Sequence, residues 1–435
     1  MIPSLIAFAA LFGQVLLRVP IAFAMIITGT VGFAFLRSWE TSLRLTGNAA
    51  FDTVFSFTLS VIPLFILMGN LLTRSGVSDA LFLTAHRALY RLKGGLAMAT
   101  IVACGGFSAV CGSSLATAAT MSKVAMPSMR KTGYADSLAT GSIAAGGTLG
   151  ILIPPSVILI IYGLLTEADI GKLFMAGILP GLLGVLFYIG AVSVTVRLKP
   201  DLAPQEAGVE TISRSDISGV IAVVGLFAVI MVGIYGGIFT PSEAAAVGAL
   251  VSLLIAIVRG KLPLRDYVAI CIDTARTSAM IFALIIGAEV FSNFVSYAGL
   301  PDAILAWVSG LDVGPYTVIL ALIVIYIILG AVLESLSMIL LTVPIFYPLV
   351  LSLDFGSGWL GDPANVTIWF GILVVVVTEI SLISPPIGLN VFVLRSVLRD
   401  VPITTIFRGI MPFWASDLIR LAVLVAFPAI ALIFN

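Results

Sequence analysis

Two long apolar stretches of this chain are each interrupted by an adjacent pair of prolines. Residues 146–163 read GGTLGILIPPSVILIIYG, and residues 379–394 read EISLISPPIGLNVFVL. Proline lacks the backbone N–H donor and its ring clashes with the preceding helical turn, so a proline pair breaks a helix. Lipid cannot satisfy the backbone groups that such a break frees. Both breaks must therefore be buried by protein or must line a polar cavity.

The chain as a whole has the composition of a membrane protein. Hydrophobic residues make up 60% of the 435 residues and charged residues 10%, against about 45–50% and about 25% in soluble domains. A helical span needs about 20 mainly apolar residues. We expect an all-α polytopic protein embedded in the lipid bilayer, with about ten true spans and several partial ones. The apolar stretches are 3–17, 20–36, 54–72, 95–120, 138–163, 173–196, 217–237, 243–258, 278–297, 316–333, 336–352, 366–394 and 411–434.

The residue inventory argues against most enzyme and nucleic-acid functions. Lys plus Arg and Asp plus Glu number 22 each, so no basic surface for nucleic acid is indicated. The chain has one histidine, no P-loop motif and no cysteine spacing typical of metal sites. We expect no enzymatic activity and no cofactor. If the chain drives uphill transport, the energy should come from an ion gradient.

The basic residues are unevenly distributed among the connections between apolar stretches. The positive-inside rule places Lys/Arg-rich loops in the cytoplasm, which predicts a multi-pass protein of a bacterial inner membrane. Residues 1–17 have no basic leader and are interpreted as the first membrane segment. The basic connections are 73–95, 121–136, 256–276 and 395–408, whereas 235–243, 297–316 and 352–365 contain no Lys or Arg.

Weak internal similarity divides the chain into two halves, 1–200 and 217–435, within one membrane-embedded unit. The hydrophilic connection 201–216 between them is interpreted as a flexible linker. Three segments of the first half match three of the second in the same order, and such repeats are common in secondary transporters. The matches are 75–81 with 298–304, 111–115 with 334–338, and 152–156 with 383–387.

Two clusters of small polar residues precede the two breaks. Residues 105–122 read GGFSAVCGSSLATAATMS, and their counterpart 330–344 contains Glu334, Ser335 and Ser337. Small residues allow helices to pack closely, so a packing face is one interpretation. The other is that each cluster forms the tip of a helical hairpin exposed to a polar cavity. Similarly, each proline pair is either a simple kink or a site where freed carbonyls bind a cation.

Four glutamates lie within or at the edge of apolar stretches, where ionisable groups are costly and usually functional. Glu243 follows Thr240 and Pro241, which is the pattern of a helix capping box, so a structural role is favoured for it. Glu334 and Glu379 flank the candidate site formed by the clusters and the breaks, and they are the stronger functional candidates. The role of Glu289 is left open.

Several stretches resemble the large membrane subunit of tripartite ATP-independent periplasmic (TRAP) transporters, the DctM family. The resemblance runs essentially end to end, and its most specific parts are GGIFTPSEAAAVGA and TEISLISPPIGLNVFV. The segments are 16–24, 111–119, 129–156, 236–249 and 378–393.

The resemblance implies an elevator-type transporter fold with inverted repeats, two re-entrant helical hairpins and two unwound transmembrane helices. The hairpins would lie near 95–125 and 316–352, and the broken helices at 138–163 and 366–394. It also implies sodium-driven symport of an organic acid that a periplasmic substrate-binding protein (DctP type) delivers. A small four-helix membrane subunit (DctQ type) is expected as a separate chain.

The resemblance assigns two sodium sites and a substrate site between the hairpin tips. Glu334 stands where many relatives have Asp. The sodium ions are expected at Ser113, Gly150 and Pro155 and at Ser337 and Pro386, within ion-binding segments that comprise Cys111, Gly112, Ser113, Ser114, Gly150, Ile153, Pro154, Pro155, Gly330, Glu334, Ser337, Met338, Ser384, Pro385 and Pro386. The substrate-binding candidates are Ser113, Ser114, Thr117, Ser156, Ser335, Glu379 and Asn390.

Two other functions remain open at this level. The chain could be a stand-alone ion-coupled carboxylate transporter without a binding protein, or a membrane scaffold or intramembrane enzyme. No motif distinguishes a C4-dicarboxylate from a sialic acid or a keto acid as the substrate.

Overall fold

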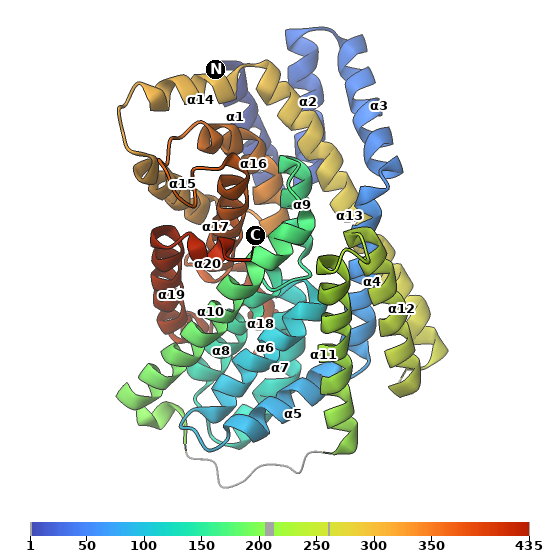
Figure 1. The fold of residues 1–435 in the computed structure, drawn as a ribbon, viewed down its shortest axis with the longest axis vertical. Helices are drawn as coiled ribbons and strands as arrows, with labels where there is room; N and C mark the ends of the chain where they lie inside the picture. The colour runs from blue at the N-terminus through green and yellow to red at the C-terminus, as the bar shows by residue number, and fades with distance from the viewer. Residues whose placement is uncertain (1, 205–212, 260–261, 435) are drawn as a thin grey trace.

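A computed structural model describes residues 2–204, 213–259 and 262–434, and this part of the chain is almost entirely helical (Figure 1). The first half contains α1 (Ile2–Leu16), α2 (Ile21–Leu36), α3 (Trp39–Phe55), η1 (Thr58–Ser60), α4 (Val61–Arg74), α5 (Val77–Leu89), α6 (Gly95–Cys111), α7 (Ser114–Lys131), α8 (Asp136–Thr148), η2 (Leu149–Ile151), α9 (Val157–Thr166), α10 (Ile170–Leu198) and η3 (Pro200–Leu202). The second half contains α11 (Arg214–Tyr235), α12 (Pro241–Arg259), α13 (Leu264–Tyr297), α14 (Leu300–Ser309), α15 (Pro315–Gly330), α16 (Ser335–Leu351), α17 (Pro363–Ile383), α18 (Leu389–Val397), α19 (Ile403–Ala426) and α20 (Ala429–Leu432).

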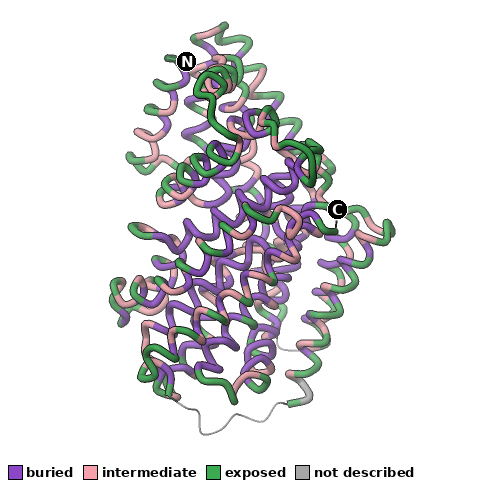
Figure 2. Tube along the Cα trace, turned by 60° about the vertical axis from the view of Figure 1, so that its left-hand side comes forward, coloured by how far each residue is buried: buried purple, intermediate pink, exposed green. Residues whose placement is uncertain are grey.

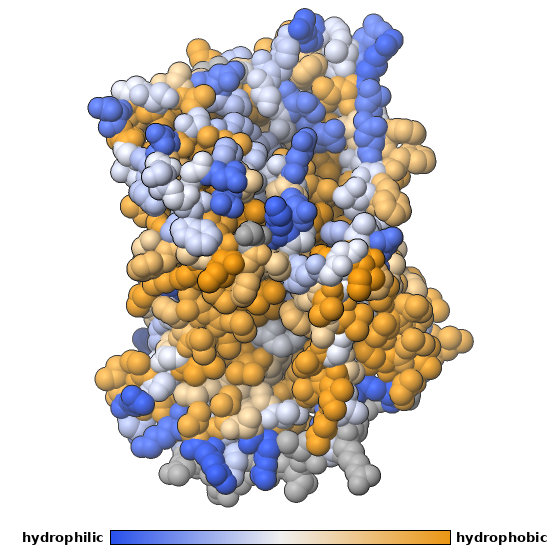
Figure 3. Space-filling view, viewed as in Figure 1, coloured by the Kyte–Doolittle hydropathy of each residue, from blue (hydrophilic) through white to orange (hydrophobic). Residues whose placement is uncertain are grey.

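The helices and the apolar surface are those of a multi-pass membrane protein. Within the described ranges, six helices are long and apolar enough to cross a bilayer, and a seventh span results if α3 and α4, bent by 60°, count as one. The expected number of about ten is therefore too high by this criterion. Many apolar stretches form helices of only 10–17 residues because breaks and turns divide them. Apolar side chains cover much of the middle of the face in Figure 3, with hydrophilic ones toward its two ends.

The two halves follow the same order of elements. In each half a helix, α4 or α13, is followed two residues after its end by a glycine with positive φ, Gly76 (74°) before α5 and Gly299 (72°) before α14. A helical hairpin follows, α6–α7 in the first half and α15–α16 in the second. An interrupted helix comes next, α8–α9 or α17–α18, and then the long helix α10 or α19. In Figure 1 the first hairpin lies mainly in the lower half of the molecule and the second in the upper half.

Helix α17 forms the centre of the bundle. All its residues from Val366 to Ile383 are buried, which fits the purple centre of the trace in Figure 2. A continuous run of Val and Ile can pack on every side of such a helix. Two hydrogen bonds fix its position: the Tyr162 hydroxyl donates to the Thr367 carbonyl at 2.7 Å, and Trp369 Nε1 donates to the Leu424 carbonyl at 3.0 Å.

Local capping signals in the sequence are borne out. Thr240 N donates to Glu243 Oε2 at 2.8 Å and Glu243 N donates to Thr240 Oγ1 at 3.3 Å, which is the expected capping box at the start of α12. Glu243 is therefore a structural residue.

Several expected connections contain helices. Segment 73–95 includes α5, 121–136 includes the end of α7, and 297–316 includes α14. Each of these helices packs on the bundle through one apolar face and has polar residues on the other. Such a segment is less hydrophobic than a membrane span and is easily taken for a loop from its sequence. Of the expected linker 201–216, residues 205–212 lie outside the described part, and Arg214 already begins α11.

Candidate functional site

The first small-polar cluster forms the turn of the α6–α7 hairpin. Helix α6 ends at Cys111, and Gly112 turns the chain with φ of 61°, a conformation that glycine adopts without steric cost. Ser113 then caps α7 by accepting a hydrogen bond from Ala116 N at 3.4 Å. A hairpin turn, the second interpretation of this cluster, is what the structure contains.

The second cluster forms the turn between α15 and α16. Helix α15 ends at Gly330, and residues 331–334 lead into α16, which begins at Ser335. Glu334 occupies the N-cap position, and its Oε2 accepts a hydrogen bond from the Ser337 hydroxyl at 3.3 Å. The carbonyl of Glu334 accepts from Met338 N at 2.9 Å.

The two hairpin turns meet at one cavity of about 230 Å³. Its lining comes from both turns, the first break with the start of α9, the end of α17, and helices α4 and α13. The turns, the break, α9 and α17 contribute Cys111, Gly112, Ser113, Ser114, Leu115, Ala116, Ile151, Val157, Ile158, Glu334, Ser335, Leu336 and Leu382, and α4 and α13 contribute Ile66, Asn70, Thr277, Met280 and Ile281.

Helix ends give this cavity its electrostatic character. The first-turn residues of α7, α9 and α16 line it, and a helix N-terminus carries roughly half a positive charge together with unsatisfied N–H groups. The C-terminal residues of α6, η2 and α17 also reach the lining, so carbonyl ends lie close by. The same cavity therefore offers amide donors to an anion and carbonyl acceptors to a cation.

Glu334 is the only charged side chain among the described residues that line the cavity. No Lys or Arg from this set is present to balance an anionic ligand. An anion in this cavity would therefore depend on helix N-termini and on cations bound nearby.

The first proline break packs directly against the first hairpin turn. Gly150 lies so close to Ser113 that a Cβ at position 150 would come within 3.1 Å of the Ser113 carbonyl. The carbonyl of Pro155 lies 3.4 Å from where a Cβ of Gly112 would be. Ile153 is half-buried, and Pro154 and Pro155 are buried. The structure thus places Gly150 and Pro155 of the break next to Ser113 and Gly112 of the turn.

The second proline break is less buried than the first. Ser384 is buried, with its hydroxyl donating to the Ile380 carbonyl at 2.7 Å and accepting from Trp414 Nε1 at 2.8 Å. Pro385 and Pro386 are exposed, in contrast to the buried pair of the first break. Gly330 packs against Ser381 and against the Met338 sulfur, so the α15 end of the second hairpin contacts α17.

Four expected substrate residues do not line the cavity, whereas Ser113, Ser114 and Ser335 do. The hydroxyls of Thr117 and Ser156 donate to the carbonyls of Ser113 and Ile151, at 2.8 Å and 2.5 Å. Asn390 Nδ2 donates to the Ala144 carbonyl at 3.0 Å, and Glu379 pairs with Arg420. At least one polar atom of each residue thus makes a contact inside the bundle, which spacing along the chain cannot indicate.

Glu289 lies away from this cavity. It lines a separate cavity of about 610 Å³ with Asp52 and Glu167, and its Oε2 accepts a hydrogen bond from Thr53 Oγ1 at 3.5 Å.

Two polar residues that line the cavity, Asn70 and Thr277, are not among the site residues predicted from the sequence. Asn70 on α4 donates through Nδ2 to Thr274 Oγ1 at 2.9 Å, and Thr277 lies one turn further along α13. Asn70 follows the apolar run VIPLFILMG, so an uncharged polar residue inside a predicted span was the available signal.

Comparison with known proteins identifies the family. The model of the "Tripartite ATP-independent periplasmic transporter, DctM component" matches residues 8–430. The chain is 33% identical, over 90% of its length and 89% of the relative, to the C4-dicarboxylate TRAP transporter large permease protein DctM of Pseudomonas aeruginosa. It is 30% identical, over 97% of its length and 96% of the relative, to the sialic acid TRAP transporter large permease protein SiaM of Vibrio cholerae.

The fold has a relative among solved structures. The YdaH transporter of Alcanivorax borkumensis superposes with a TM-score of 0.64 at 16% identity, over 89% of each chain. The broken helices, the paired hairpins and the sequence match agree: this chain belongs to the DctM family of TRAP transporter large permease components.

Proposed function

We propose that this chain imports an organic acid across the bacterial inner membrane by sodium symport. The observation that carries the proposal is the cavity where the two hairpin turns meet. Three helix N-termini provide amide donors for a carboxylate, while Glu334 and the nearby carbonyl ends favour cations. A cavity with these features suits a carboxylate that enters together with sodium.

The first sodium ion would bind where the first break meets the first hairpin turn. Ser113, Gly150 and Pro155 provide hard oxygen ligands there, mainly backbone carbonyls, which are the ligands that hard cations prefer. Their close packing supports this site.

The second half of the chain corresponds to the first, so the second sodium ion would bind at the equivalent place, near Ser337 and Pro386. Glu334 would contribute negative charge beside it. Because Pro385 and Pro386 are exposed, ligands of this site would come together only when the second break is covered.

The substrate would be a small organic acid. A cavity of about 230 Å³ is below the range of roughly 300–1,000 Å³ that is typical of drug-sized ligands. C4-dicarboxylates and sialic acid, which name two relatives, share the carboxylate that helix N-termini bind. Ser113, Ser114 and Ser335 are positioned to donate additional hydrogen bonds.

We place the sliding surface of an elevator motion where α4 and α13 meet the hairpin turns. Three of the five residues that α4 and α13 contribute to the cavity lining are apolar: Ile66, Met280 and Ile281. Apolar side chains form few directional bonds, so such a boundary can shift without breaking a polar network. The chain would work with a small four-helix membrane subunit and a periplasmic substrate-binding protein.

Uptake in proteoliposomes tests the proposal. This chain is reconstituted with its small subunit, and labelled succinate or N-acetylneuraminate is supplied with the binding protein, with and without an inward sodium gradient. We expect uptake of one carboxylate only with both the gradient and the binding protein. Uptake without the gradient would contradict sodium coupling. Uptake by this chain alone would favour the stand-alone ion-coupled transporter.

A further inference from the structure

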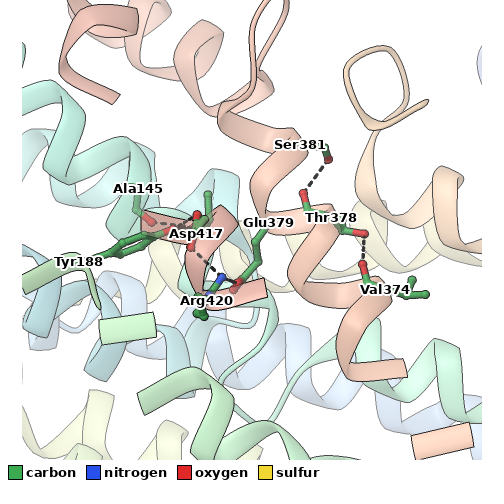
Figure 4. Close-up of polar contacts among 9 residues, drawn as sticks. Ala145, Tyr188, Val374, Thr378, Glu379, Ser381, Asp417 and Arg420 are labelled. Atoms are coloured by element: carbon green, nitrogen blue, oxygen red, sulfur yellow. Dashed lines mark hydrogen bonds and ion pairs between the residues drawn. The ribbon is translucent and has the colours of Figure 1, made fainter. Parts of the chain in front are cut away.

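A buried ion cluster lies inside the bundle (Figure 4), and none of its residues lines the cavity. Arg420 and Asp417 of α19 and Glu379 of α17 are all fully buried. Arg420 uses the same Nη2 atom for both carboxylates, at 3.0 Å from Asp417 Oδ1 and in a short contact with Glu379 Oε2. Because Arg420 follows Asp417 by three residues on one helix, both side chains project from the same face.

The cluster connects the two interrupted helices. The Tyr188 hydroxyl of α10 donates to Asp417 Oδ2 at 2.5 Å and lies 3.1 Å from Thr148 Oγ1, the last residue of α8. On the other side, Glu379 stands five residues before Ser384 of the second break. A chain of polar contacts thus extends from Thr148, beside the first break, through Tyr188, Asp417 and Arg420 to Glu379.

The charges within this cluster do not balance. Two carboxylates face one guanidinium, which leaves an excess of one negative charge at fully buried positions. Oε1 of Glu379 has no hydrogen-bond partner, and Oδ1 of Asp417 has only its ion pair with Arg420. An isolated charge in a low-dielectric interior costs many kcal/mol, and a buried group normally becomes neutral instead.

The other ionisable groups near α17 do not supply the missing positive charge. The charged and titratable groups that interact with Glu379 or Asp417 are Arg420, Tyr188 and each other. Tyr162, Tyr347 and Tyr326, on helices packed against α17, hydrogen-bond to Thr367 and Thr342. Arg395 of α18 donates instead to backbone carbonyls at Arg399 and Val401.

We infer that the Glu379–Arg420–Asp417 cluster binds one proton, carried by Glu379, in the folded protein at neutral pH. Asp417 accepts hydrogen bonds or ion-pair contacts from two groups and remains ionised, whereas Glu379 contacts Arg420 alone. A proton neutralises the excess charge without a ligand shell. Sodium needs several oxygen ligands, and the cluster offers one carboxylate oxygen without a partner, Glu379 Oε1.

Infrared spectroscopy of the purified chain in lipid nanodiscs tests the inference without requiring transport. A protonated carboxylic acid has a carbonyl stretching band that an ionised carboxylate lacks. We expect this band at neutral pH, and we expect it to shift when glutamate is labelled with ¹³C at its side-chain carboxyl. This experiment uses the wild-type chain and does not depend on any variant folding.

Variants then locate the proton. Glu379→Gln should abolish one protonated band and leave uptake and melting temperature close to those of the wild type, since glutamine resembles the neutral acid. Glu334→Gln, at the cavity, and Glu243→Gln, in the exposed capping box, should each retain that band. The inference is overturned if the wild type has no labelled band, or if Glu379→Gln retains all of them. A band that appears only after sodium is withdrawn would identify sodium, not a proton, as the occupant.

Discussion

Gly150 in the first break packs against Ser113 in the first hairpin turn so closely that a Cβ would come within 3.1 Å of the Ser113 carbonyl. These residues are 37 positions apart, and one supplies the break and the other the turn. Since both carry carbonyls expected at a sodium site, this contact is where the proposed ion binding can be tested most directly.

Gly150→Val should weaken sodium binding. The added side chain must displace the Ser113 backbone, and overpacking of this kind costs typically about 1–3 kcal/mol. If the displacement disrupts the site, the sodium concentration for half-maximal uptake should rise by roughly fivefold or more. Gly190→Val on α10 is the control, because a Cβ at Gly190 meets nothing within 4 Å. Equal sodium dependence in both variants would contradict the assignment.

Ser113→Ala should impair both helix capping and substrate binding. Loss of an N-cap costs about 0.5–2 kcal/mol, and the Ser113 hydroxyl also lines the cavity. Ser38→Ala removes a comparable cap, since Ser38 Oγ accepts from Thr41 N at 3.3 Å at the start of α3. We expect both variants to melt at lower temperature and only Ser113→Ala to raise the KM for uptake. An unchanged KM would assign Ser113 a purely structural role.

Glu243→Ala should lower stability without affecting transport. Its carboxylate accepts hydrogen bonds from Thr240 N and Thr240 Oγ1, at 2.8 Å and 2.9 Å, so the substitution removes half of the capping box. Thermal unfolding in detergent measures the effect, and uptake per folded protein should match the wild type. A large loss of uptake at unchanged stability would show that Glu243 participates in transport.

Arg420→Gln should be strongly destabilising. It leaves Asp417 ionised and buried, and removing one partner of a buried ion pair costs about 3–5 kcal/mol. Adding Asp417→Asn should recover part of that loss, because the unpaired charge is removed. Arg44→Gln is the control: its partner Glu40 lies at 2.8 Å and both side chains are 76% exposed, so we expect less than about 1 kcal/mol. Denaturant unfolding of the four proteins checks the series.

Acid should loosen the contact among α7, α8 and the loop before α19. Arg130 binds Asp400 at 2.6 Å and Asp136 at 2.9 Å, and its hydrogen bond lowers the pKa of Asp400 from the ordinary value of 3.8. The pKa of Asp400 is lower in the folded protein than in the unfolded chain. The stabilisation from its ion pair with Arg130 is therefore present above pH 3.8 and is lost as pH falls through the folded-state pKa. The melting temperature of Arg130→Gln should therefore fall less steeply in acid than that of the wild type. Parallel acid profiles would contradict this role.

Local chemistry made parts of the fold predictable. Proline pairs break helices wherever they stand, so both interruptions could be located from the sequence. The Thr240–Glu243 capping box was equally predictable, since its atoms lie within one turn. The number of spans was not, because length and hydropathy along the chain do not indicate which apolar stretches a turn divides.

The sequence by itself determined the membrane environment, the two breaks, the two small-polar clusters and the family. Only the tertiary structure decided which polar residues share the cavity: Asn70 and Thr277 line it, whereas Glu379 and Asn390 are enclosed in the bundle. The physical reason is the distance along the chain over which each kind of residue acts. Proline, glycine and capping residues act on their own backbone, whereas a polar side chain inside a membrane must find partners on other helices, and helix packing alone determines which partners are near.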